Sequence, residues 1–213
     1  MAFYALFECN PCVYRHTIHV LSLLASTKRT TTMNVHLDAF IAKIRAVWGP
    51  LTSELAASCR GFVEDLLRAP ASEPWLGALH REKPASTELH RDAEHGFLLL
   101  AHTETAGLYR PPHDHGRSWV IYGTQSGEIE ISTYGRVCDD AGNVRLVRRD
   151  QSVLRAGQAA VYLPGDIHDT RCLTSTALLY RFTERDLRIE DRRDGQVTRY
   201  AEAGGVWTTP LHA

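Results

Sequence analysis

From Gly96 to Thr183 the chain consists of short runs of β-branched, aromatic and aliphatic residues, which are separated by Gly, Pro or Asp. Seven such runs are present: GFLLLAH, SWVIYG, GEIEISTY, NVRLVRR, SVLRAG, AAVYLPG and ALLYRFT. No helical pattern lies between them, so the helical crossovers that parallel strands require are missing. The pattern therefore predicts an antiparallel β-sandwich or β-barrel.

Ahead of these runs, apolar residues recur with helical spacing in two segments. The first covers residues 35–48 and ends at a Gly-Pro pair. The second runs from Leu51 to about Leu67, with Pro70 beyond its end. Such periodicity predicts two amphipathic helices. We expect them to cover the barrel rather than to form a second domain.

The domain organisation that follows has three parts. Residues 33–80 form a helical cover and residues 81–213 form the barrel, so that 33–213 is one domain. Residues 1–32 carry no pattern that would pair with the strands. We interpret them as a poorly structured extension that is not native, and we take Met33 as the true first residue because helical periodicity begins directly after it.

Charge and cysteine content limit which partners and which cellular compartment we expect for this protein. The formal net charge is −1, which gives no reason to expect nucleic acid or anionic lipid as a partner. No apolar run approaches the roughly 18 residues that a membrane span needs. The 5 cysteines are an odd number and widely spread, which favours free thiols in the cytoplasm. We expect a cytoplasmic protein whose partners are small molecules.

A pair of histidines one residue apart, in RPPHDHGRSW, is the strongest chemical signal. If this stretch is a strand, His113 and His115 project from one face while Asp114 points away. Two imidazoles so placed can bind one ion, but a third ligand must come from a neighbouring strand. His168, which follows a Pro-Gly turn in YLPGDIHD, is the best candidate. Nothing in the sequence marks His102, a further histidine of this region, as a ligand.

The wider pattern resembles the cupin superfamily. Gly107, His113, His115 and Gly127 have the spacing of its first motif, and GQAAVYLPGDIH resembles its second. The resemblance implies a mainly β fold, a cupin-type double-stranded β-helix barrel with an N-terminal pair of α-helices. Cupins commonly add a glutamate at the position of Val120, so here the resemblance implies a metal held by three neutral histidines.

Within the cupins, residues 85–190 resemble the thiol dioxygenases of the cysteine dioxygenase and 3-mercaptopropionate dioxygenase type. The stretches HDHG.SW and HRD.EH.F carry this likeness. It implies Fe(II) bound by His113, His115 and His168. It also implies an oxidoreductase that binds a small thiol beside dioxygen and converts it to a sulfinate.

This sequence departs from that family in the residues around the three histidines. Val120 excludes the cysteine–tyrosine crosslink of the mammalian-type enzymes, and Thr87 stands where the carboxylate-binding arginine of the cysteine enzymes would fall. The Ser-His-Tyr relay aligns with Leu179, Arg181 and Thr183, so no member of it is present. We expect Arg181 to point into the barrel as a substrate-binding residue.

Arg192 aligns near the arginine of the bacterial 3-mercaptopropionate enzymes and is the second candidate substrate-binding residue. The sequence leaves three readings open. They are oxidation of a thiol carboxylate, cleavage of a 1,3-dicarbonyl by dioxygen, and a module that binds metal and a small anion without turnover. Nitrogen ligands alone do not distinguish iron from zinc, nickel or copper.

Overall fold

The structure is a computed structural model, and it describes residues 34–209. The expected extension over residues 1–32 lies outside the described residues. All described residues belong to one compact unit. Among residues 34–209 there is no helix that combines the length and the apolar character needed to cross a bilayer.

Three helices precede the strands: α1 (Val35–Val47), α2 (Ser53–Leu67) and α3 (Pro74–Glu82). The first two are the helices that periodicity predicted. Thr52 caps α2, because its side-chain oxygen accepts a hydrogen bond from the Leu55 N–H at 3.1 Å. The third helix was not predicted. It begins at a proline, which is favourable in a first helical turn, and it spans only 9 residues, too few for a periodic signal.

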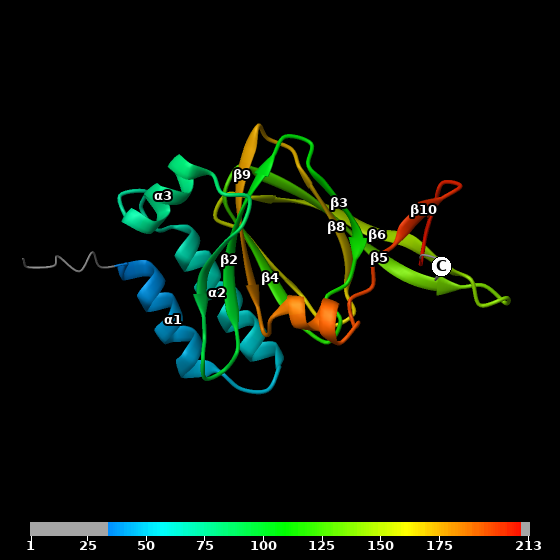
Figure 1. Ribbon diagram of the computed structural model, residues 1–213, viewed down its shortest axis with the longest axis horizontal. Coiled ribbons are helices and arrows are strands. Elements are labelled where there is room, and N and C mark those ends of the chain that lie inside the picture. The colour runs from blue at the N-terminus through cyan, green and yellow to red at the C-terminus, as the bar shows by residue number, and fades with distance from the viewer. Residues whose placement is uncertain (1–33, 210–213) are drawn as a thin grey trace, which may run out of the picture. The chain divides into compact units, whose positions relative to one another are not determined.

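The strands form two antiparallel sheets that face each other (Figure 1). The five-stranded sheet has the order β1 (Thr87–Arg91), β2 (Leu98–Thr105), β9 (Thr176–Thr183), β4 (Val120–Ser126), β7 (Ala159–Tyr162). The four-stranded sheet has the order β3 (Tyr109–His113), β8 (Ile167–Cys172), β5 (Glu128–Cys138), β6 (Val144–Arg155). The alternation of strands between the sheets, 2-9-4-7 and 3-8-5-6, is that of a jelly roll, the topology of the cupins. The predicted fold class is confirmed: a mainly β, double-stranded β-helix barrel with N-terminal helices.

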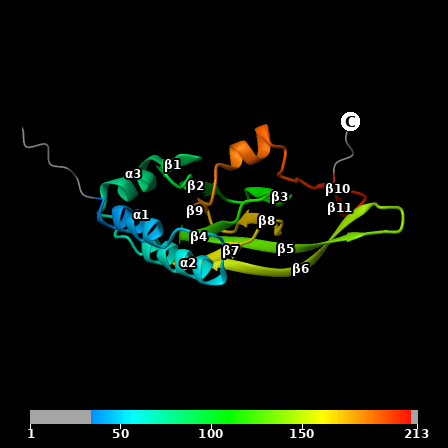
Figure 2. The ribbon, with the colours of Figure 1, turned by 90° about the horizontal axis from the view of Figure 1, so that it is seen from below.

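The main core lies between the helices and the outer face of the five-stranded sheet (Figure 2). On β9, Leu178, Tyr180 and Phe182 point into this core, where Phe40 of α1 packs on Phe182 with ring centroids 6.0 Å apart. Side chains alternate along a strand, so Arg181 turns to the barrel interior. The helices thus cover one face of the sheet and leave the other face for the site.

The strand assignment from sequence differs from the structure in two ways: β1, β3 and β8 are not among the seven predicted runs, and two of those runs belong to one strand. The runs NVRLVRR and SVLRAG, taken as two strands, form the single strand β6, which pairs with β5 over its whole length. This long hairpin extends past the barrel and carries the small pair β10 (Ala201–Ala203) and β11 (Val206–Thr208) beside it (Figure 1). Polar residues inside β6 look like a turn in the sequence, but that segment is exposed on an outer strand and has no need to be apolar.

Candidate metal centre

His113, His115 and His168 come together at the barrel interior. His113 is the last residue of β3, and His168 on β8 is its direct partner in the antiparallel register. His115 lies two residues beyond the end of β3, in a turn. The convergence was predicted, but the strand alternation used to predict it does not extend to His115. The turn brings this side chain to the other two.

The geometry of the cluster suits a single small ion. The ring centroids are 5.2 Å apart for His113 and His115, 5.0 Å for His113 and His168, and 4.9 Å for His115 and His168. One nitrogen from each ring lies within 4.8 Å of the others. No carboxylate or thiol of residues 34–209 joins this group. The cluster is therefore a candidate metal site with three nitrogen ligands.

The protonation of the three rings fits metal binding. Burial lowers the pKa of all three, and the ring charges of His168 and His113 lower the pKa of His115 further. Each ring is therefore neutral at pH 7, the form that binds a metal. His113 Nδ1 donates to the Pro111 carbonyl at 2.8 Å, which leaves Nε2 with the lone pair.

Unsatisfied ring nitrogens provide the test of fit. His115 Nδ1 and both nitrogens of His168 are buried without a hydrogen-bond partner in the described part of the chain. An unpartnered buried polar atom costs about 1–3 kcal/mol, so three of them in one place need a ligand. A divalent ion would bind one nitrogen of each ring, so it would satisfy His115 Nδ1 and one of the two His168 nitrogens, and the residues present fit such a group.

The two aspartates next to the histidines in sequence form hydrogen bonds with other groups. Asp114 accepts hydrogen bonds from the N–H groups of Gly116 at 3.0 Å and Thr198 at 2.9 Å. Asp169, beside His168, accepts from the Tyr134 hydroxyl at 2.6 Å and from the Tyr109 hydroxyl at 3.0 Å. Through these hydrogen bonds both carboxylates hold the backbone around the cluster, and neither of them joins the three histidines.

The cluster opens into a cavity of about 550 Å3 in the barrel interior. Both predicted substrate-binding residues border it: Arg181 is half-buried on β9, and Arg192 is exposed on the segment that follows. Arg181 lies opposite Tyr122 of β4 in the sheet register. The Tyr122 hydroxyl lies 3.3 Å from His115 Nε2, and burial raises the pKa of this phenol, so the hydroxyl stays protonated. Tyr122 thus stands between the cluster and Arg181.

The arginines around the cavity differ in whether a carboxylate neutralises them. Arg110 donates to the buried Glu104 at 2.8 Å, and Arg199 donates to Asp191 with two hydrogen bonds of 2.6 and 2.7 Å. Arg181 and Arg192 form no ion pair with any residue in the 34–209 range, and Arg181 Nε is buried without a hydrogen-bond partner. Arg181 therefore places an uncompensated positive charge inside the cavity.

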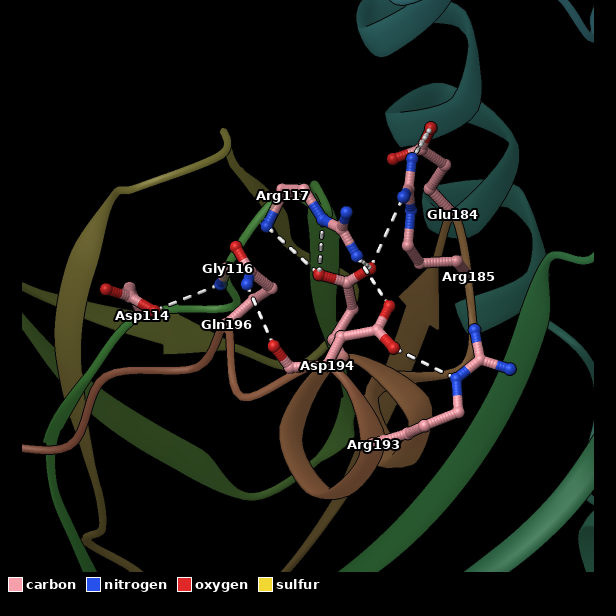
Figure 3. Close-up of polar contacts among 9 residues, drawn as sticks. Asp114, Gly116, Arg117, Glu184, Arg185, Arg193, Asp194 and Gln196 are labelled. Atoms are coloured by element: carbon pink, nitrogen blue, oxygen red, sulfur yellow. Dashed lines mark hydrogen bonds and ion pairs between the residues drawn. The ribbon is translucent and has the colours of Figure 1, made fainter.

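One wall of the cavity is made by residues 184–200, which we call the strap. Figure 3 shows how residues directly after the histidine pair hold it. Arg117 donates to Glu190 of the strap through Nε at 3.2 Å and Nη2 at 3.0 Å, and to Asp194 at 2.7 Å. Glu190 is only 2% exposed. Its burial acts to raise its pKa, but the hydrogen bonds from Arg117 outweigh this and lower it.

Gly116 is required where the strap crosses the histidine segment. Its φ is +62°, and a Cβ at this position would lie 2.9 Å from Gln196 Cβ. A side chain here would meet both a strained backbone and the strap. No sequence pattern indicates this contact, since Gly116 and Gln196 are far apart in the chain. The HDHGR segment thus provides two histidines for the cluster and three residues that seat the strap.

Comparison with known proteins finds only distant structural likenesses. No protein-family model matches the chain, and no curated protein matches it in sequence. The cupin domain of Schizosaccharomyces pombe Cnp3 is similar at 14% identity and TM-score 0.37, over 51% of this chain and 69% of that one. KdgF from a Halomonas species is similar at 17% identity and TM-score 0.37, over 47% and 79%. A double-stranded β-helix protein from Klebsiella pneumoniae is similar at 15% identity and TM-score 0.36, over 47% and 70%. Such distant likeness carries nothing about ligands, reactions or partners.

Proposed function

We propose that this chain is a non-haem Fe(II) dioxygenase that oxidises a small thiol carboxylate to a sulfinate. The observation that carries the proposal is the uncompensated Arg181 guanidinium in the same cavity as the three-histidine cluster. A cation buried near a dication is costly unless an anion lies between them. A substrate with an acidic end and a metal-binding end provides that anion.

In this proposal each residue at the site has its own role. His113, His115 and His168 would hold the iron, which supplies adjacent open coordination positions where a thiolate and dioxygen can meet. Arg181 docks the carboxylate with charge-assisted hydrogen bonds. Arg192, at the exposed rim, attracts the anion as it enters. Leu179 and Leu187 provide apolar wall that limits water around the sulfur.

The overall reaction needs no further reactant. Both atoms of dioxygen end on the sulfur, the S–H bond breaks, and the proton is released as the sulfinate forms. Sulfur loses four electrons and dioxygen gains four, so no separate reductant is required. The partners of the protein in this proposal are therefore only the thiol and dioxygen.

Oxygen consumption by the iron-loaded protein tests the proposal. A panel should contain small thiols with and without a carboxylate and several 1,3-diketones. We expect uptake with acidic thiols, and sulfinate as product in a one-to-one ratio with dioxygen. Uptake only with diketones would replace the proposal by carbon–carbon cleavage. Tight binding of small carboxylates without any uptake would identify a module that binds metal and anion without turnover.

Arg181→Leu sharpens the same experiment. Iron content should stay unchanged, because Arg181 is not one of the ligands. KM for an acidic thiol should rise about 10- to 150-fold, the loss of one charge-assisted hydrogen bond, while KM for its uncharged analogue changes little. The matched control is Arg199→Leu, because Arg199 borders the same cavity but is neutralised by Asp191, which is partly exposed and so does not become a buried unpaired charge. Equal effects of Arg181→Leu on both substrates would contradict the role given to Arg181.

A further inference from the structure

His102 is a polar group of the cavity wall that the proposed chemistry does not use. It lies on β2, whose inner face borders the cavity. Its Nε2 atom is buried and has no hydrogen-bond partner among the residues that the structure describes. Arg181 Nε, on the neighbouring strand, is in the same condition. A buried polar atom is costly to leave without a hydrogen bond. Because two such atoms lie on one wall of the cavity, a ligand that forms hydrogen bonds with both would be favoured.

One of the two atoms is a hydrogen-bond acceptor and the other is a donor. Burial, followed by the positive charges of Arg181 and Arg110, lowers the pKa of His102 to about 3, so the ring is neutral. The ring also makes a hydrogen bond to the backbone of Ala85. Since Nε2 is unpartnered, Nδ1 donates that bond to the Ala85 carbonyl, and Nε2 carries the lone pair. His102 is thus an acceptor beside Arg181, which is a donor.

The sheet register places the two side chains in one row with the metal cluster. Arg181 pairs with Tyr122 on one side and with Leu100 on the other, and His102 pairs with Leu179. Arg181 and His102 are therefore diagonal neighbours on the same face, about 7–8 Å apart at the backbone. From His115 the row runs through Tyr122 to Arg181 and then to His102. A ligand that reaches Arg181 from the cluster can also reach His102.

We propose that His102 and Arg181 form a two-point subsite for a carboxylate that has a neutral hydrogen-bond donor, a hydroxyl or amide N–H, on the neighbouring carbon. The subsite deepens the function proposed above and rests on it. Arg181 binds the carboxylate, and His102 Nε2 accepts from the donor. Arg181 thus selects substrates that carry a carboxylate, and His102 selects among them those with a neutral hydrogen-bond donor on the neighbouring carbon.

The charges around His102 disfavour an ammonium group as the donor. Arg181 has no carboxylate partner, and the buried Glu104 is already bound to Arg110 at 2.8 Å. The local field therefore repels a second cation. The same charges of Arg181 and Arg110 add to burial, the main cause, in lowering the pKa of the His102 ring. A 2-hydroxy acid satisfies both atoms without adding positive charge. A 2-amino acid satisfies the acceptor but meets that repulsion.

Three thiol acids that differ only at carbon 2 test this preference: 3-mercaptopropionate, 3-mercaptolactate and cysteine, with hydrogen, hydroxyl and ammonium there. Binding to the Fe(II)-loaded full chain is measured by calorimetry without oxygen. We expect 3-mercaptolactate to bind about 3- to 10-fold more tightly than 3-mercaptopropionate, one neutral hydrogen bond. Cysteine should bind at least about 10-fold more weakly than 3-mercaptolactate. Equal affinities, tightest binding of cysteine, or no binding of any of the three overturns the proposal.

Variants of His102 assign the preference to this side chain. His102→Leu should make 3-mercaptolactate and 3-mercaptopropionate bind equally, and His102→Gln, which restores an acceptor, should recover part of the difference. The control is His80→Leu, on α3 and away from the cavity, which should keep the wild-type preference. If His102→Leu does not fold, the Gln variant still decides. A preference unchanged in a folded His102→Leu protein overturns the subsite.

Oxygen uptake, measured separately, distinguishes this failure from failure of the proposed oxidation. Preferred binding of 3-mercaptolactate without sulfinate formation would support the subsite and contradict thiol oxidation. Sulfinate formation at equal KM for the hydroxyl and hydrogen compounds would support the oxidation and overturn the subsite.

Discussion

At the scale of single residues, His168 is the side chain on which the metal site depends most. It is fully buried, and both ring nitrogens lack a partner within residues 34–209. We predict that His168→Ala lowers metal affinity at least about 100-fold, because even the loss of an outer-shell partner costs 10- to 100-fold. Metal content after dialysis, measured by mass spectrometry, checks this. His80→Ala, on α3, should retain one metal ion per chain, and a loaded His168→Ala protein would mean that the third ligand is wrongly assigned.

The pH dependence of metal binding is also decided by single residues. Free imidazole has a pKa of about 6.5, so ordinary histidine ligands lose metal as the pH falls through that value. Burial lowers the pKa of His113, His115 and His168, so protons compete only at lower pH. We predict that metal affinity, measured by competition with a chelator, is nearly constant from pH 7.5 to about 6.5 and declines only below that range. A decline that begins above pH 6.5 would show that the rings are not shielded.

The same shifts act on the metal-free protein. A histidine whose folded pKa lies below its unfolded value binds protons more readily in the unfolded state. Stability is therefore complete above about pH 6.5 and is lost progressively as the pH falls below it. Metal-free protein should accordingly unfold at lower denaturant concentration at pH 5.5 than at pH 7.5.

At the scale of elements, the strap depends on Glu190. Its carboxylate receives hydrogen bonds from Arg117 and, at 3.3 Å, from Arg185 Nη1. We predict that Glu190→Gln raises hydrogen exchange of the strap amides about 10-fold or more, since a charge-assisted bond is lost, while exchange in the barrel strands stays the same. Glu184→Gln is the control, because Glu184 also pairs with Arg185 but is partly exposed. Equal exchange in the two variants would mean that the buried pair does not seat the strap.

At the scale of the whole molecule, residues 34–209 contain both sheets and all three helices described above. They also contain the residues described above for the core between the helices and the five-stranded sheet. We predict that a chain beginning at Met33 melts within about 2 °C of the full chain, a difference of less than about 1 kcal/mol for a domain of this size. Calorimetry of both chains is the measurement, and a clear loss of melting temperature would show that residues 1–32 contribute to the fold.

Features that depend on local order along the chain could be predicted from the sequence. Periodicity located α1 and α2, and short β-rich runs predicted an antiparallel barrel. Alternation on β9 predicted that Leu178, Tyr180 and Phe182 are core and that Arg181 faces inward. These predictions succeeded because the period of side chains in a helix or strand is fixed by backbone geometry.

Contacts between distant segments could not be predicted from the sequence and follow from the way the strands pair. Arg117 and Glu190 are 73 residues apart, and Arg45 donates at 2.6 Å to Asp92, 47 residues away. His102 has the same sequence character as any histidine on a strand, and the register with β9 alone puts it beside Arg181. Periodicity gives the face of each residue but not the strand that pairs with it. The order of the strands in the two sheets therefore decided which polar side chains share the cavity.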